Sequence, residues 1–252
     1  MTWLIDLSQR RREPEVMDDP ALDAARHHAA LRGLARINRW SGSVRAIWSA
    51  IRPLAREHRA GPLRVLDIAT GGGDIPIGLW RRARRAGLPL EVAGCDCSAR
   101  AVEYAQSRAA QTDTPTRFFV LDALRDELPH DYDVLVSALF LHHLDDDQAT
   151  IFLRRMTTAA RRLVVVSDLL RSRAGLVLAF LGTRTLTTSG VVRTDGLRSV
   201  RAAFTLAEVR HWATQAGLDG VELARRWPCR FLLTWRRRVA APAPLFTLAQ
   251  NR

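Results

Sequence analysis

A short stretch near residue 70 joins acidic residues to three consecutive glycines, a pattern that could bind a cofactor. It runs from an apolar segment through Asp67-Ile-Ala69-Thr-Gly71-Gly72-Gly73-Asp74 into a helix-like segment. Glycine lets the backbone turn sharply and approach a ligand where a Cβ would block it. The helix start that follows has free N–H groups. Because ligands of a parallel α/β sheet bind beyond the carboxyl ends of its strands, we expect this loop to hold a nucleotide-like cofactor.

Two further acids stand where later strands are expected to end. Asp96 could accept hydrogen bonds from two ribose hydroxyls, and Asp122 could reach an adenine amino group. With Asp67 and the glycine loop, they favour a ligand that carries ribose, adenine and positive charge rather than phosphates. A P-loop is excluded because the chain has no lysine, and the dinucleotide pattern G-x-G-x-x-G starts at Gly71 but fails at Pro76.

The segments that must position these residues alternate between short apolar runs and helix-like stretches. Five runs rich in Val, Leu, Ile and Phe are predicted to be parallel strands, since nearly continuous apolar runs are typical of strands covered on both faces. Two more runs are separated only by Pro228-Cys229-Arg230 and are predicted to form an antiparallel hairpin. The expected strands are 64–70, 90–96, 116–122, 133–140, 162–169, 220–227 and 231–236. This order predicts an α/β fold with a doubly wound sheet.

The remaining segments predict additions to that sheet. Residues 1–60 contain no strand-like run and are expected to form a helical lead-in or lid. The α/β domain covers 61–238 and includes an insertion at 170–200. The insertion is expected to be structured because so long a loop would be unusual, and its residues 175–187 have a helix-like pattern. Thr205-Leu-Ala-Glu208 has the spelling of a capping box at a helix start. Residues 239–252 are expected to form a C-terminal tail.

Composition limits the partners and the location of the chain. The 252 residues carry a net charge of +12, but all 38 basic residues are arginine and are scattered, which indicates codon bias more than a nucleic-acid surface. Three cysteines give neither a disulfide framework nor zinc-ligand spacing, so we expect no metal site. No segment has the pattern of a signal peptide or a transmembrane helix, so a cytoplasmic location is expected.

With these motifs in place, residues 60–238 resemble the class I S-adenosylmethionine-dependent methyltransferases. Their glycine motif, acid-x-Gly-x-Gly-x-Gly, matches residues 67–73 with Ala69 at the first glycine, a variant similar to that of quinone-biosynthesis methyltransferases. Their fourth-strand motif matches Asp133 through Leu144. The resemblance implies a Rossmann-like seven-stranded sheet of order 3-2-1-4-5-7-6 with strand 7 antiparallel.

The resemblance also implies the cofactor and its contacts. S-adenosyl-L-methionine would be the methyl donor and S-adenosyl-L-homocysteine the product. The positions it implies for donor binding lie at successive strand ends: Asp67, Ala69, Thr70, Gly71, Gly73, Asp96, Cys97, Asp122, Ala123 and Ala138.

Two adjacent histidines follow the expected fourth strand, beside the methyl site that the resemblance implies. A phenol with a pKa of ~10 is only about 0.1% ionised at pH 7, so a base is useful, and histidine titrates near neutrality. His143 is the first candidate for the catalytic base because it aligns with the more recurrent family histidine, and His142 is the second. The alternative is that both rings pack or cap the loop before Asp145-Asp146-Asp147.

The acceptor pocket is expected between the lead-in, around Leu34, Asn38 and Trp40, and the insertion over 176–187. Both are apolar enough to enclose a flat, lipophilic aromatic substrate, although the apolar segment 176–181 could instead be a packing helix or a homodimer contact. The insertion and the segment Asp195 to Phe204 are similar to small-molecule methyltransferases of bacterial natural-product pathways, that is, of secondary metabolism.

Several functions remain open at this stage. The first is O-methylation of a small aromatic or polyketide-like acceptor, and the nearest alternative is C-methylation of a quinone precursor. The chain lacks the Gly-Leu-Arg-Asn segment that marks the quinone enzymes and has His142-His143 there instead. An RNA methyltransferase is suggested by charge alone. A non-catalytic protein that keeps the fold is disfavoured by the intact glycine loop, Asp96 and Asp122.

Overall fold

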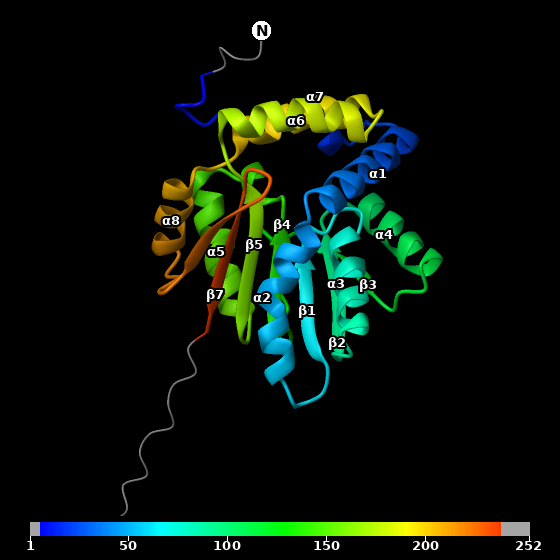
Figure 1. Ribbon diagram of the computed structural model, residues 1–252, viewed down its shortest axis with the longest axis vertical. Coiled ribbons are helices and arrows are strands. Elements are labelled where there is room, and N and C mark those ends of the chain that lie inside the picture. The colour runs from blue at the N-terminus through cyan, green and yellow to red at the C-terminus, as the bar shows by residue number, and fades with distance from the viewer. Residues whose placement is uncertain (1–5, 238–252) are drawn as a thin grey trace, which may run out of the picture.

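The computed structural model describes residues 6–237 and is built on one seven-stranded sheet (Figure 1). Its order is β3-β2-β1-β4-β5-β7-β6, in which β7 runs antiparallel to both neighbours. The predicted order, the Rossmann-like class and the closing hairpin are therefore confirmed. The strands are β1 (Leu63–Ile68), β2 (Leu90–Asp96), β3 (Arg117–Val120), β4 (Val134–Ala138), β5 (Leu163–Leu169), β6 (Glu222–Arg226) and β7 (Arg230–Arg236).

Helices cover both faces of the sheet, which explains the apolar strands. One face packs against α2 (Ser43–Glu57), α3 (Asp74–Arg85) and α4 (Ala99–Gln111). The other face packs against α5 (Asp146–Ala159) and α8 (Leu206–Gln215), both of which begin with a capping box. The box at Thr205 and Glu208 is the one that the sequence predicts. No described helix is long and apolar enough to cross a membrane.

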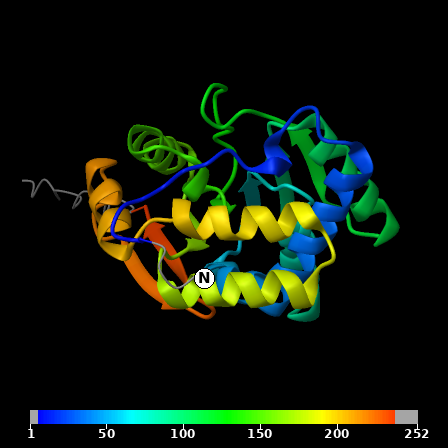
Figure 2. The same cartoon turned by 90° about the horizontal axis from the view of Figure 1, so that it is seen from above.

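A roof of helices lies over the carboxyl ends of the parallel strands (Figure 1). It consists of α1 (Ala24–Trp40), α6 (Arg173–Leu186), α7 (Gly190–Ala202) and the N-terminal segment, residues 6–23, which includes the 3-10 helix η2 (Val16–Asp18). Seen from above, α6 and α7 lie side by side and the N-terminal segment runs along α7 (Figure 2). A second 3-10 helix, η3 (Leu141–His143), follows β4 under this roof.

The insertion differs from the expectation in one respect. The sequence predicts a single helix over 175–187, whereas residues 190–202 form a second helix, α7, whose Gly196 and β-branched start have low helix propensity. Packing of α7 against α6 and α1 supplies the stability that its low helix propensity does not. The division into lead-in, domain and tail stays a prediction, and the tail 239–252 lies outside the described residues.

The loop that joins β1 to α3 turns through three residues in the left-handed region. Ala69 has φ 57°, Gly71 has φ 51° and Gly73 has φ 72°. A Cβ on Gly73 would stand 2.8 Å from the ring of Phe118 and 2.9 Å from Ala105. Glycine is therefore required at 73 both for its conformation and for the close approach of β3 and α4.

We predict opposite outcomes for two matched changes in this loop. Gly73→Ala adds left-handed strain of about 1–2 kcal/mol and overpacking of about 1–3 kcal/mol, so it should lower the free energy of unfolding by about 2–4 kcal/mol. Ala69→Gly relieves strain but frees the unfolded chain, so it should change stability by less than about 1 kcal/mol. Urea denaturation of the purified variants measures both, and equal stability of Gly73→Ala and the wild type would contradict the prediction.

Candidate active site

The glycine loop, residues 69–73, is tied to the end of β2. Asp96 accepts a hydrogen bond from the Gly71 N–H at 2.9 Å and another from the Ser98 N–H at 2.9 Å. The Thr70 N–H donates to the carbonyl of Cys95. These bonds hold the loop and the strand-end acid in one rigid unit at the carboxyl edge of the sheet.

Three acids at this unit, Asp67, Asp74 and Asp96, have raised pKa values because the positive charge around them does not offset their desolvation. Asp67 is fully buried, and its Oδ1 atom has no hydrogen-bond partner among the described residues, although Oδ2 accepts from the Thr70 hydroxyl at 2.7 Å. Burial, with the nearby charges of Asp74 and Asp96, raises the pKa of Asp67 well above its usual value. Burial also raises the pKa values of Asp74 and Asp96. A cationic ligand would relieve this cost.

The lead-in helix covers the loop from above. Leu31 of α1 lies over Gly71 and Gly72, with side-chain atoms within 4 Å of the positions that Cβ atoms would take. About two turns further along α1, the Asn38 amide nitrogen lies 3.1 Å from a carboxylate oxygen of Asp74. The roof therefore closes directly on the cofactor loop.

The other predicted contacts also lie at the carboxyl edge. Asp122 follows β3 and caps the next turn by accepting from the Leu124 N–H, and Ala123 beside it is buried. Cys97 is exposed at its surface. Desolvation and the charges of Asp96 and Asp122 raise the pKa of its thiol, so these three side chains are neighbours. Ala138 ends β4, one residue beyond the partner of Ile68. Their part in binding stays a prediction.

His142 lies between two carboxylates in the buried end of the site. Its Nδ1 is 2.7 Å from Oδ1 of Asp168, which also accepts the His142 backbone N–H, and its Nε2 is 3.5 Å from Oε1 of Glu15. Burial alone lowers the pKa of His142, but the charges and hydrogen bonds of Asp168 and Glu15 outweigh it and raise the pKa to about 10. In this arrangement the ring is charged and is not free to accept a proton.

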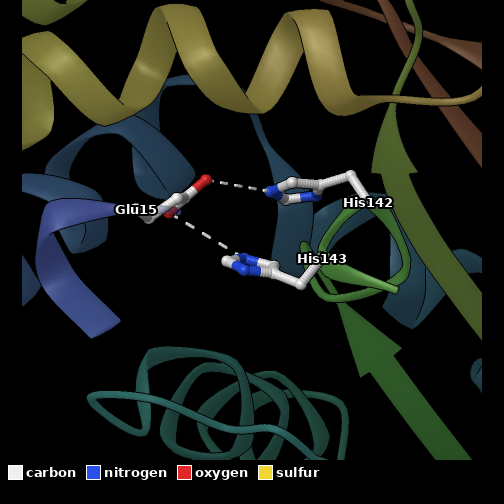
Figure 3. Close-up of side chains that lie close together, drawn as sticks. All are labelled: Glu15, His142 and His143. Atoms are coloured by element: carbon white, nitrogen blue, oxygen red, sulfur yellow. Dashed lines mark ion pairs between the residues drawn. The ribbon is translucent and has the colours of Figure 1, made fainter. Parts of the chain in front are cut away.

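His143 is more exposed and faces the same glutamate. Its Nε2 is 3.9 Å from Oε2 of Glu15 (Figure 3), and its Nδ1 is 3.2 Å from Oδ2 of Asp18. A positive charge on His143 also lowers the pKa of Asp96. The histidine pair, His142 and His143, therefore stands beside the cofactor loop.

A mainly apolar cavity of about 140 Å³ opens on the histidine pair. Leu34, Ile37 and Trp40 of α1 line one side. Side chains of α6 and α7 line the other: Leu178, Ala179, Gly182, Thr183, Leu186, Val192, Gly196, Ser199 and Val200. A cavity is thus confirmed where the sequence predicts a pocket between lead-in and insertion, although Asn38 turns away to Asp74.

Sequence reasoning misses three acids of this site. Asp168 is the second-to-last residue of β5, close to the position that Asp96 has at the end of β2, so the strand-end rule could have found it. Glu15 and Asp18 come from the N-terminal segment, where no local pattern announces a contact with residues more than a hundred positions away. The sequence predicts no metal site, yet Glu15, His142 and His143 offer ligand atoms within 4.8 Å of one another.

Comparison with known proteins gives a consistent picture. Residues 65–162 match the family model of a methyltransferase domain. The demethylmenaquinone methyltransferase of Deinococcus radiodurans is 34% identical over 107 residues, which cover 42% of this chain and 43% of that protein, so the match spans less than half the relative's length.

Two solved structures share the fold at low identity. Magnesium protoporphyrin IX methyltransferase from Synechocystis PCC 6803 with bound S-adenosylhomocysteine superposes with a TM-score of 0.55, 21% identity, and 78% and 84% coverage of this chain and that one. An O-methyltransferase family 2 protein from Planctomyces limnophilus in complex with apigenin superposes with a TM-score of 0.56 and 18% identity, and the match covers 87% of this chain and 63% of that one. Residues 65–162 thus match the model of a methyltransferase domain, and the described residues share the fold of these methyltransferase structures.

Proposed function

We propose that this protein transfers a methyl group from S-adenosyl-L-methionine to the hydroxyl of a small aromatic or polyketide-like acceptor. One observation carries the proposal: the glycine loop follows β1, the histidine pair follows the neighbouring strand β4 at the same edge of the sheet, and both histidines line the apolar cavity. Donor, acceptor and a group that can handle a proton then share one site. Holding the reacting atoms in line in such a site can be worth roughly 7–11 kcal/mol.

The residues at the glycine loop fit this donor. Its sulfonium and ammonium groups are cationic, and Asp67, Asp74 and Asp96 form a buried acidic cluster with an unpartnered carboxylate oxygen. Residues 69–73 would let the donor approach the backbone closely, Asp96 would accept from ribose hydroxyls, and Asp122 would take the adenine amino group. The sulfonium supplies an activated methyl group, so this chain has to position the donor and exclude water.

The cavity supports a small, flat acceptor. An apolar cavity of about 150 Å³ is known to hold benzene, so about 140 Å³ matches one aromatic ring. Apigenin in one structural neighbour is an aromatic compound, and the substrates named for the other two proteins, protoporphyrin and demethylmenaquinone, are also unsaturated ring systems. We assign the removal of the hydroxyl proton to His143, and His142 is the charged group beside it.

C-methylation of a quinone precursor is the second candidate, and the identity to the demethylmenaquinone methyltransferase favours it. The same cavity would hold the ring, with a carbon rather than an oxygen towards the donor. Labelled-methyl transfer to phenols and quinols, followed by mass spectrometry of the products, separates an ether from a ring-methylated product.

Donor binding should depend on Asp96. Asp96→Ala removes hydrogen bonds from a charged acceptor to ribose, each worth about 1.5–3 kcal/mol, so we expect binding of S-adenosylhomocysteine to weaken by about 10–100-fold or more. Isothermal titration calorimetry measures it. Asp219→Ala, an exposed loop acid, is the matched control, and an unchanged dissociation constant for folded Asp96→Ala would overturn the assignment of this loop.

Filling the cavity should block the acceptor and spare the donor. Ala179→Trp places a large side chain into the space between α6 and α1, so we expect the KM of the acceptor to rise at least about tenfold, with donor affinity unchanged. Ala174→Trp, on the exposed side of the same helix, is the control. Equal kinetics of the two variants would place the acceptor elsewhere.

Removal of either histidine should slow methyl transfer rather than weaken donor binding. We expect His143→Ala to lower kcat by about 10²–10⁴-fold, the usual range for loss of proton transfer. We expect His142→Ala to lower kcat as well, because it removes the charged partner of Asp168 and Glu15 beside the acceptor cavity. The measurement is single-turnover methyl transfer with a phenolic acceptor, and His211→Ala, at an exposed histidine of α8, is the control. Unchanged turnover in both variants would remove the histidine pair from the mechanism.

A further inference from the structure

We propose that Glu15, His142 and His143 form a binding site for one first-row divalent cation of the zinc, cobalt or manganese type. The three side chains converge from two segments far apart in sequence: Glu15 immediately precedes η2, and the histidines end η3 (Figure 3). Two imidazoles and one carboxylate are a common protein ligand set for such ions.

The spacing of the ligand atoms suits a metal ion. His142 Nε2 and His143 Nε2 lie 3.5 Å and 3.9 Å from the two oxygens of the Glu15 carboxylate. Ligands that each stand about 2.0–2.2 Å from an ion are separated from one another by about 3–4 Å. Small side-chain movements would therefore complete the coordination.

The far nitrogen of each ring is held by a second carboxylate. His142 Nδ1 meets Asp168 at 2.7 Å and His143 Nδ1 meets Asp18 at 3.2 Å. When an ion binds, a proton kept on Nδ1 would leave Nε2 of each ring free to coordinate it beside Glu15. Metal-ligating histidines nearly always have such a carboxylate or carbonyl partner, which fixes the tautomer and raises ligand basicity. Both rings have this arrangement, which favours a metal site over a chance cluster of side chains.

The negative charge of the site also favours binding of a cation. Glu15, Asp168 and Asp18 bring three carboxylates around two imidazoles. The guanidinium groups of Arg10 and Arg230 both interact electrostatically with Asp168, and Arg10 also donates to the carbonyls of His142 and Leu144. Among the described residues, the ion pairs of Glu15 within 4.0 Å are those with the two histidines. A bound dication would offset the negative charge of these carboxylates.

Glu15 is fixed in place by the insertion. Asp195 of α7 accepts hydrogen bonds from the backbone N–H groups of Val16 and Met17 at 2.8 Å and 3.0 Å. The Ser199 hydroxyl donates to the Glu15 carboxylate. Helix α7 therefore pre-organises the one ligand that comes from outside η3, which reduces the ordering that ion binding requires.

The open side of this site faces the acceptor cavity, which is lined by all three ligands. On the proposed function, the ion would lower the pKa of an acceptor hydroxyl, whose proton would pass to water. The two imidazoles would then serve as ligands rather than as bases. This role depends on the proposed function, whereas binding of the ion does not.

Titration of the EDTA-treated full chain with Co²⁺ and with Zn²⁺ tests the site directly. We expect one ion per chain by calorimetry and by elemental analysis, and a Co²⁺ absorption spectrum that reports nitrogen and oxygen ligands. His143→Ala and Glu15→Gln should weaken binding by more than about 100-fold, and Asp18→Asn by about 10–100-fold. His211→Ala and Glu57→Gln, at exposed positions, should bind as the wild type does.

Circular dichroism and S-adenosylhomocysteine binding confirm that each variant is folded. The inference is overturned if the folded wild type takes up no stoichiometric ion, or if His143→Ala and Glu15→Gln bind it unchanged. Loss of ion binding with undiminished methyl transfer would leave the proposed function standing. A bound ion without methyl transfer to phenols or quinols would overturn the acceptor assignment and leave the metal site standing.

Discussion

The uncompensated negative charge at the carboxyl edge of the sheet is the constraint on which the site depends. Asp67 is buried and Asp74 and Asp96 are half-buried at the glycine loop, where desolvation raises their pKa values. On the other side, the hydrogen bonds and charge of His142, which lies between Glu15 and Asp168, help to lower the pKa values of both carboxyls. Burying charge is costly unless a partner is present. One group of acids suits a cationic methyl donor, and the other suits a proton or a metal ion.

The sequence predicts what local patterns encode. Apolar runs specify seven strands within a few residues of their observed ends, and Thr205 with Glu208 specifies the start of α8. The strand-end rule places the glycine loop and Asp96 correctly at the same edge. It does not reach Glu15, because a carboxylate far upstream meets His142 only after the roof has folded. It also misses α7, whose stability comes from packing rather than from propensity.

The roof couples distant parts of the chain into one unit. Glu13 pairs with Arg198 and Arg201 of α7, and the Arg11 N–H donates to the Arg201 carbonyl. Arg171, just before α6, forms a two-pronged ion pair with Glu208 and donates to the Leu7 carbonyl. The N-terminal segment therefore depends on the insertion for its position, and the insertion depends on the start of α8. Because these anchors fix the position of Glu15, a substitution in α7 should alter the contact of Glu15 with the histidine pair.

Two residues with a left-handed backbone follow neighbouring strands at the carboxyl edge of the sheet. Ala69 follows β1 and Leu139 follows β4, two strands that pair in the sheet, and both residues have φ 57°. Left-handed conformations cost such residues about 1–2 kcal/mol each, so the surrounding contacts must outweigh that cost. At Ala69 the strain turns the Gly71 N–H towards Asp96, and at Leu139 it starts the turn that carries the histidine pair back under the roof. Strained backbone at two adjacent strand ends is typical of sites whose geometry is set before a ligand arrives. The same two turns bring the donor loop and the histidine pair to one point, which is the arrangement that methyl transfer requires.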